Sequence, residues 1–233
     1  ARETAARVAA GAIAKLLLNE LNIDVRSGIC EIDGVKADNF NFENARNSEI
    51  FALDSNVEDA QKNAILKAKN SHNSVGGVAL INVKNCPVGL GEPIYHKLDA
   101  QIANAMMSIN AVKAVEIGDG ILASRVLGFD NNDQIRKSGF KTNHSGGILG
   151  GISNGDDINV KVYFKATPSI FIEQETVDIY GNEVECKLKG RHDPCVAIRG
   201  SVVAESMTAL VLADMLLLNM SSKVENIKKV YAK

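Results

Sequence analysis

The segment KGRHDPCVAIRG, from Lys189 to Gly200, places an arginine, a histidine and an aspartate in succession directly before a proline. In an extended chain adjacent side chains point to opposite faces, so Arg191 and Asp193 would share one face and His192 the other. An arginine can bind a phosphate through charge-assisted hydrogen bonds that contribute about 1.5–3 kcal/mol each. The segment therefore predicts either an anion clamp with a carboxylate base beside it or a surface ion pair.

A second polar run, FKATPSI, directly follows a stretch of alternating apolar and polar residues. Lys165, Thr167 and Ser169 recur at a spacing of two, so all three would share one face if the chain stays extended. Pro168 removes a backbone donor, which restricts the segment to a strand end or an edge. One cation and two hydroxyls suit a phosphate or a polar ring, and the alternative is an exposed polar face.

The segment NHSGGILGGISNG, from Asn143 to Gly155, concentrates glycines, which let a backbone approach a ligand closely and turn amide hydrogens toward an anion. It matches neither the phosphate loop that ends in GK[ST] nor the GxGxxG motif. A tight turn between strands is an equally good interpretation. His144 in this segment is more often a structural histidine than a catalyst.

Composition restricts the classes of protein to consider. The chain has 233 residues, with 26 basic and 28 acidic side chains and a formal net charge of -2. This balance argues against nucleic-acid binding and against a polybasic membrane face. No apolar run approaches the roughly 18 residues that span a bilayer, and no signal peptide opens the chain. Because the cysteines form no CxxC pair, we expect no metal site and a reducing, cytoplasmic location.

Periodic patterns indicate the elements that position these segments. A helix is expected over Ala5 to Leu21, where apolar residues wrap so far around that it should be deeply buried, and another over Ser201 to Asn219. Ser55 and Glu58 form a capping-box pattern for a third helix. Ile158 to Lys165 alternates like a half-buried antiparallel strand. Helices mixed with antiparallel strands, and no linker, predict a single α+β domain over residues 1–233.

Several longer stretches occur together in one order: ARETAARVAAGAIAK, GLGEPIYHKLDAQIANAMMSINAVKAVEIGDG, HSGGILGGISNG, FKATPSI, and GRHDPCVAIRG followed by ALVLAD. Together they closely resemble the chorismate synthase family from Ala1 to about Asp214. The chain departs from the family at Ala166, where proline is common, and at Ala114, where glycine is usual. The family also carries a long segment before ARET, with two histidines that act as acids. Since this chain opens inside a helical pattern, we expect upstream residues to be missing.

The resemblance implies a fold and an activity. The family fold is a β-α-β sandwich, a helical layer between antiparallel sheets, assembled as a homotetramer. Its members are carbon–oxygen lyases that convert 5-enolpyruvylshikimate-3-phosphate to chorismate and phosphate in aromatic amino-acid biosynthesis, and they require reduced FMN. The resemblance also links NADP to the activity, although the sequence does not say how the flavin is reduced.

Carried over position by position, the resemblance implies roles for single residues. Asp193 would be the base that relays a proton near the flavin, with His192 as a structural spacer, and Arg2 and Arg191 would hold the substrate. Three cations, those of Arg2, Lys165 and Arg191, are too few for two phosphorylated ligands, so the missing segment should supply further arginines. The flavin contacts implied are Asn110, Ala111, Gly150, Lys165, Ala166, Thr167, Pro168, Ser169 and Arg191.

Two alternatives to the flavin-dependent lyase stay open. The chain could be a non-catalytic core fragment that folds and oligomerises but lacks the N-terminal histidines. A general nucleotide-phosphate-binding module is the other alternative, and it rests only on the glycine-rich segment.

Overall fold

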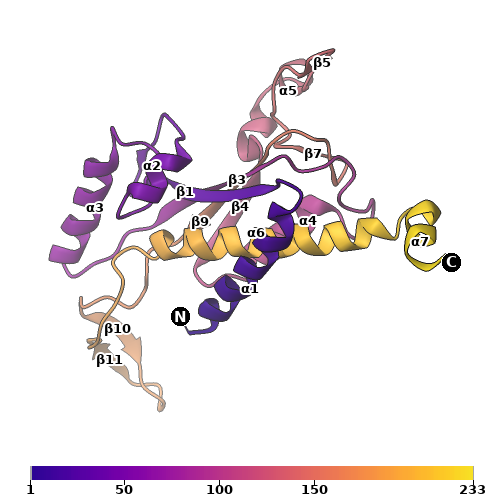
Figure 1. Ribbon diagram of the computed structural model, residues 1–233. Coiled ribbons are helices and arrows are strands. Elements are labelled where there is room, and N and C mark those ends of the chain that lie inside the picture. Colours follow the sequence, from indigo (N-terminus) through magenta and orange to yellow (C-terminus); the bar gives the residue numbers. More distant parts are fainter. Residues whose placement is uncertain (1, 233) are drawn as a thin grey trace.

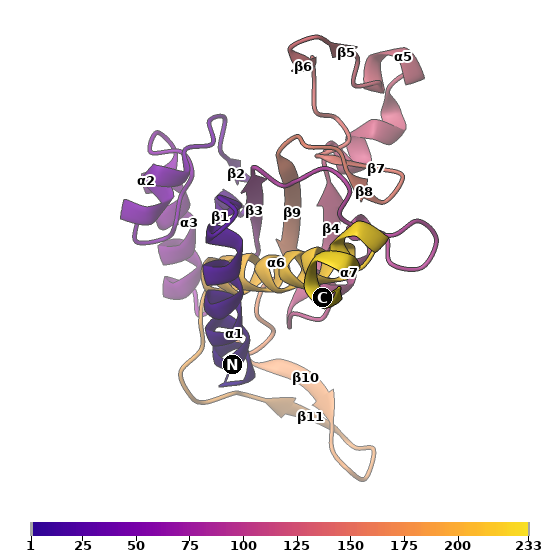
Figure 2. The same cartoon turned by 45° about the vertical axis from the view of Figure 1, so that its right-hand side comes forward.

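The computed structural model describes residues 2–232, with side chains from residue 3 onward, and its centre is a five-stranded sheet (Figures 1 and 2). All neighbouring strands are antiparallel, in the order β2-β1-β3-β9-β4. Asp33 and Gly34 form the tight turn between the first two strands, with φ of 50° and 80°, as an Asp-Gly pair favours. The strands of the sheet are β1 (Asp24–Ile32), β2 (Val35–Lys36), β3 (Gly77–Lys84), β4 (Val112–Ile117) and β9 (Ile158–Phe164).

Three helices cover one face of this sheet: α1 (Arg2–Asn19), α4 (Leu98–Met107) and α6 (Ala197–Met220). Figure 2 shows α6 running across the strands, and Figure 1 shows α1 crossing α6. The apolar face of each strand and the helices form the main core, because each fully buried aliphatic side chain contributes about 1.5–3 kcal/mol. Its fully buried members include Leu18, Ile29, Ile81, Leu98, Ile102, Val160 and Leu212.

The crossing of α1 and α6 is a close backbone contact. Gly11 is buried there, and a Cβ atom at this position would lie 2.6 Å from Ser206 Cα and 2.7 Å from the Ser206 carbonyl oxygen. Glycine is therefore required at the crossing by packing, although it is a poor helix former.

The opposite face of the sheet is covered only in part. There α2 (Phe42–Asn47) closes a small second core with Cys30, Leu53 and Leu80 among its buried residues. Burial raises the pKa of the Cys30 thiol to about 12. α3 (Glu58–Asn70) lies beside β1, and the remaining face is polar, with the Tyr163 hydroxyl donating to Glu116 at 2.7 Å.

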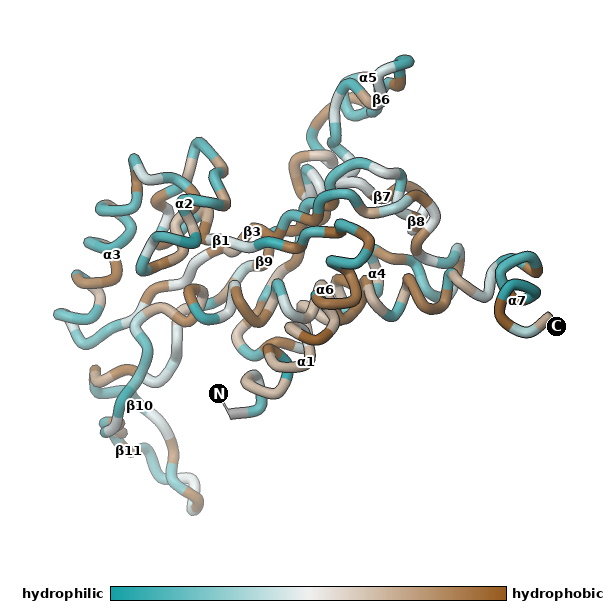
Figure 3. The backbone as a smooth tube through the Cα atoms, in the orientation of Figure 1, coloured by the Kyte–Doolittle hydropathy of each residue, from teal (hydrophilic) through white to brown (hydrophobic). Residues whose placement is uncertain are grey.

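Two extensions leave the body at opposite ends of the sheet (Figure 2). One carries η1 (Gly120–Arg125), α5 (Gly128–Asn131) and the hairpin of β5 (Ile135–Arg136) and β6 (Gly139–Phe140), next to the hairpin of β7 (Ile148–Leu149) and β8 (Ile152–Ser153). The other is the hairpin of β10 (Gln174–Val177) and β11 (Glu183–Cys186), while α7 (Val224–Tyr231) follows α6. Figure 3 shows hydrophobic residues along α6 and α1, whereas much of α7 is hydrophilic.

The α+β class is confirmed, and the described residues supply the helical layer and one large antiparallel sheet of the expected sandwich. The predicted alternation of β9 is also confirmed, since its apolar residues are buried and its polar ones only half-buried. The predicted deep burial of the first helix is wrong: Ile13 and Leu16 are 71% and 67% exposed.

Two predictions about where helices begin are also wrong. No side chain caps α3, because Glu58 instead accepts a hydrogen bond from Ser48 at 2.8 Å and pairs with Lys62. α6 begins at Ala197, ahead of the predicted Ser201. With 24 residues and a mean hydropathy of 1.8 over its most apolar window, α6 is long and apolar enough to cross a membrane, although half of that window is buried, as in a core helix.

Candidate functional site

Two of the three segments that the sequence singled out, those of Lys165 and Arg191, lie at one end of the sheet, where β9 ends and β3 and β4 begin. Lys165 N–H donates to the Ala111 carbonyl at 2.9 Å, which joins the segment after β9 to the turn before β4. Val75 N–H donates to the Pro194 carbonyl at 2.8 Å, which joins the segment before α6 to the start of β3. Four stretches far apart in the sequence are therefore joined in two pairs by backbone hydrogen bonds.

The polar run after β9 forms a loop, since the strand ends at Phe164. Ser74 donates its hydroxyl to the Thr167 carbonyl at 2.6 Å, and Phe171 N–H donates to the His72 carbonyl at 3.1 Å. Lys165 is exposed, whereas the Thr167 hydroxyl oxygen is buried and has no hydrogen-bond partner. The sequence predicted that Lys165, Thr167 and Ser169 share one face if the strand continues through them. The strand ends at Phe164, so strand geometry does not place these three side chains on one face.

In the segment Arg191–Pro194, the arginine and the aspartate do not pair with each other. Asp193 pairs with Arg199 on the first turn of α6, at 2.9 Å between Oδ2 and Nη1. Arg191 forms no hydrogen bond or ion pair with any other described residue and is exposed. The surface pair of Arg191 and Asp193 that the sequence allowed is therefore absent from the described structure, and Arg191 is available to an anion.

His192 packs between this segment and the loop after β9. Its ring lies 5.3 Å from the ring of Phe171, centroid to centroid, and its Nε2 is buried without a partner. Beside these rings is a cavity of about 570 Å³ lined by His72, Phe171, Lys187, Leu188, Lys189 and Gly190. Two lysines and an aromatic wall make this cavity suitable for a flat anionic ligand.

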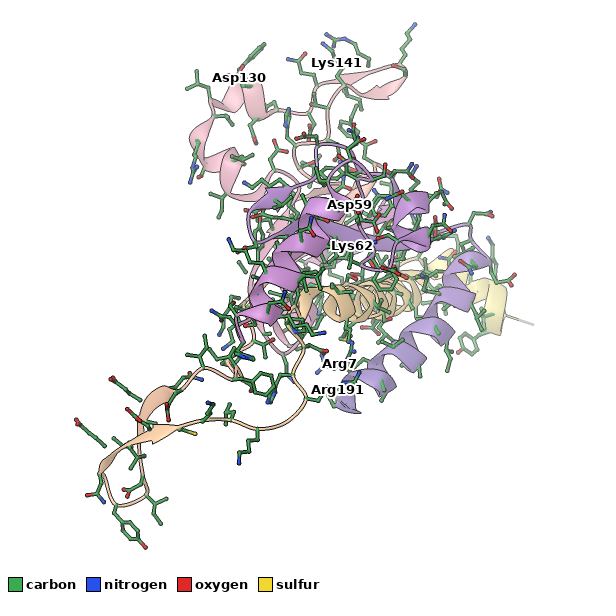
Figure 4. All side chains as sticks on the ribbon, turned by 90° about the vertical axis from the view of Figure 1, so that its left-hand side faces the viewer. Arg7, Asp59, Lys62, Asp130, Lys141 and Arg191 are labelled. Atoms are coloured by element: carbon green, nitrogen blue, oxygen red, sulfur yellow. The ribbon has the colours of Figure 1, made fainter. Side chains whose placement is uncertain are left out.

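Arg7 is a site residue that the sequence analysis missed. From α1 its Nη1 donates to Ser108 Oγ at 2.7 Å, directly before the Asn110–Ala111 turn, and Figure 4 shows it on the side of the molecule that carries Arg191. The available signal was its position four residues after Glu3, and these two do form an ion pair at 2.5 Å. A pair at this spacing usually only stabilises a helix, so it did not indicate a site residue. The side chain of Arg2, predicted to hold substrate, lies outside the described side chains.

Gly150 is not brought to this end of the sheet. It forms the two-residue turn of the β7–β8 hairpin with Gly151, at φ of 62° and 86°, so the tight-turn interpretation describes this segment. The hairpin lies near the start of β9, and Figure 2 shows it at the opposite end of the sheet from the β10–β11 hairpin. Within one chain, Gly150 is separated from Lys165 by the length of β9. The predicted contact between Gly150 and the flavin stays a prediction.

His144 and Asp133 have structural roles beside the same hairpin. His144 Nδ1 lies 2.6 Å from Asp119 Oδ2. Burial by itself would raise the pKa of Asp133, but hydrogen bonds from Ser145 N–H, the Thr142 hydroxyl and His144 N–H lower it to about 2. The carboxylate thereby anchors the extension that carries α5 to the glycine-rich segment.

The fold and the site together define an α+β protein that presents unpaired cations, a buried hydroxyl without a partner and an arginine-paired carboxylate at one sheet end. Those groups are suited to binding a phosphorylated ligand and to accepting a proton next to it. The chain belongs to the chorismate synthase family, whose family model matches residues 1–217.

Individual relatives agree with this assignment. The chain is 83% identical over all of its 233 residues to the chorismate synthase of Aliarcobacter butzleri (strain RM4018), and 64% identical over the same length to that of Sulfurimonas denitrificans. A crystal structure of chorismate synthase superimposes with a TM-score of 0.79 at 33% identity, over 98% of this chain and 67% of that one. The chain spans 65% of the length of the two curated relatives.

Proposed function

We propose that this protein is a chorismate synthase that eliminates phosphate from 5-enolpyruvylshikimate-3-phosphate with the help of reduced FMN. The observation that carries the proposal is the Thr167 hydroxyl, buried without a partner in the loop where the family resemblance predicts the flavin phosphate. The unpaired Arg191 supports it, because a phosphate would satisfy both groups. The cytoplasmic location, the homotetramer and the link to NADP belong to the same proposal.

The residues at the sheet end fit FMN in type. Lys165, Thr167, Ser169 and Arg191 would hold its phosphate and ribityl chain through two cations and two hydroxyls. The Asn110–Ala111 turn would offer backbone groups to the ring, with Ala111 held at φ 72° and its carbonyl occupied by Lys165. When bound, reduced FMN supplies electron density to the substrate as phosphate leaves.

The elimination breaks one carbon–oxygen bond and one carbon–hydrogen bond and forms one carbon–carbon double bond. Phosphate departs with the electron pair of the first bond, and the electron pair of the second becomes part of the new double bond. Asp193 accepts the proton at its carboxylate, which Arg199 orients. The cations of Arg7 and Arg191 stabilise the negative charge of the substrate and of the departing phosphate.

The experiment is anaerobic turnover by this chain with reduced FMN and 5-enolpyruvylshikimate-3-phosphate, measured as phosphate release and chorismate formation in the same sample. Equal amounts of both products would support the proposal. Binding of FMN without turnover would favour the non-catalytic core fragment. A chain that binds ATP but not FMN would instead be a general nucleotide-phosphate-binding module, and the site assignment would be wrong.

The role of Asp193 is tested separately in the full-length protein. Asp193→Asn keeps the shape of the side chain but removes the proton acceptor, so turnover should collapse while FMN affinity changes little. Asp59→Asn is the matched control, because Asp59 is an exposed carboxylate on α3 and should leave turnover unchanged. Parent-like turnover by Asp193→Asn would remove the proton-relay role.

A further inference from the structure

The carboxylate of Asp193 is held by Arg199, an arginine of the same KGRHDPCVAIRG segment to which the sequence alone gave no role. Arg199 Nη1 lies 2.9 Å from Asp193 Oδ2, and this is the one ion pair that Asp193 forms with the described residues. The contact engages a single carboxylate oxygen. The geometry thus distinguishes Oδ2, which faces the guanidinium, from Oδ1.

The backbone that carries Arg199 is fixed against the strands of the site. Ala197 is fully buried, and a Cβ atom at Gly77 of β3 would lie 2.9 Å from its side chain. Gly200 is so close to the ring of Phe164 that a Cβ atom there would lie 2.5 Å from Cζ. Since Phe164 is the last residue of β9, the first turn of α6 is held in place directly beside Lys165.

The backbone next to Asp193 is fixed in the same way. The Pro194 carbonyl accepts from Val75 N–H at 2.8 Å, and Cys195 is buried. The backbone is therefore fixed at both ends of the ion pair, and what stays free is rotation about the side-chain bonds of Asp193 and Arg199. The contact between the two side chains restricts this rotation.

The pair contributes to orientation more than to stability. Its side chains are 69% exposed for Arg199 and 36% for Asp193, and exposed ion pairs contribute little to folding stability. A reacting group, in contrast, must be held within about 0.5 Å of its working position, and a displacement of about 1 Å lowers turnover on the order of 100-fold.

We propose that Arg199 is a positioning residue that holds Asp193 Oδ2 and so directs Oδ1 to the proton that leaves the substrate. This inference rests on the proposed function, in which Asp193 is the proton acceptor. It also assigns different tasks to two neighbouring arginines: Arg199 orients the carboxylate, and Arg191, which has no partner among the described residues, binds the anionic ligands.

The test compares Arg199→Gln and Arg199→Lys in the full-length protein by turnover, substrate KM, FMN affinity and thermal stability. Arg199→Gln should lower kcat by about 10- to 100-fold, with KM, FMN affinity and Tm close to those of the parent. Arg199→Lys keeps a cation that can make a single contact, so it should restore most of kcat. Arg46→Gln is the control, since Arg46 is 62% exposed and pairs with Glu43 on α2, away from the site.

A structural readout does not depend on activity. In a crystal structure of the Arg199→Gln variant the Asp193 carboxylate should rotate or show more than one orientation, while the backbone at Pro194 stays in place. An unmoved carboxylate, or parent-like kcat in Arg199→Gln, would overturn the inference. If kcat is parent-like in Arg199→Gln but collapses in Asp193→Asn, the proposed function stands without the positioning role. If both variants turn over normally, Asp193 is not the proton acceptor and the inference falls with that role, whereas only a parent protein without turnover would contradict the proposed function itself. A variant that loses ligand affinity at unchanged kcat would make Arg199 a binding residue instead.

Discussion

Gly11→Ala should destabilise the protein although alanine is the better helix former. A methyl group at Gly11 would lie 2.6 Å from Ser206 Cα and 2.7 Å from the Ser206 carbonyl oxygen, where carbon atoms prefer about 3.5–4.0 Å. The helices α1 and α6 would therefore have to separate by about 1 Å. Because the atoms in the way are Ser206 Cβ and two backbone atoms of Ser206, none of which moves when a side chain rotates, rotation cannot relieve the contact.

The magnitude follows from two opposing contributions. Replacement of glycine inside a helix stabilises by about 0.8–1.0 kcal/mol, whereas overpacking of a close contact costs about 1–3 kcal/mol or more. With backbone atoms involved we expect the upper part of that range, which leaves a net loss of about 1–2 kcal/mol. At about 2–4 °C per kcal/mol for a domain of this size, Tm should fall by about 2–8 °C.

The assay is thermal and urea unfolding of the parent and the variant, and two further variants sharpen it. Gly128→Ala is the matched control, because Gly128 is in α5 and a Cβ atom there would meet nothing within 4 Å. It should leave Tm unchanged or raise it slightly. Adding Ser206→Gly to Gly11→Ala should restore part of the loss, since it removes the serine Cβ but leaves its backbone. A Gly11→Ala protein as stable as the parent would refute the close crossing of α1 and α6.

Three further predictions concern the site and its support. Lys165→Ala should weaken FMN binding and reduce the salt dependence of that binding, as measured by flavin fluorescence titration; unchanged affinity would return Lys165 to the role of a solvated lysine. Thr167→Val should raise the free energy of unfolding of the ligand-free protein by about 1 kcal/mol, because it removes a buried hydroxyl that has no partner among the described residues, and it should weaken FMN binding; a less stable variant would contradict the unpaired hydroxyl. Because the pKa of Asp133 is lowered from 3.8 to about 2, its stabilising contribution is present above pH 3.8 and lost as the pH falls through 2. Asp133→Asn should therefore flatten the fall of Tm with pH over that interval, whereas Asp130→Asn, an exposed carboxylate in α5, should not.

Local patterns determined much of this protein. The alternation of Ile158, Val160 and Val162 predicts β9 because side chains of a strand point alternately to its two faces, and the structure buries those three residues. The Asp33–Gly34 pair forms a hairpin turn for a similarly local reason, because these residue types accept a positive φ. The long motifs identified the family, and the family model confirms it.

The errors arose where neighbours distant in sequence decide the outcome. Glu58 follows the capping-box spacing, but in the folded chain it accepts a hydrogen bond from Ser48, which precedes the helix by 10 residues. The apolar residues of α1 are as hydrophobic as those of a buried helix, yet only the side at Gly11, Ala14 and Leu18 meets the core. The hydrophobicity of a helix alone does not specify which of its faces will be buried against other helices or strands.

The site shows the same division. Sequence alone identified Lys165, Arg191 and Asp193 as groups able to bind an anion and to accept a proton, because residue type determines charge and hydrogen-bonding capacity. Only the tertiary structure decided that Asp193 pairs with Arg199, that Arg191 has no partner among the described residues, and that Arg7 contacts Ser108. It also decided that the β7–β8 hairpin, with Gly150 in its turn, lies at the other end of the sheet. The physical reason is that an ion pair or a hydrogen bond depends on distances of about 3 Å, and those distances are set by how the strands and helices pack.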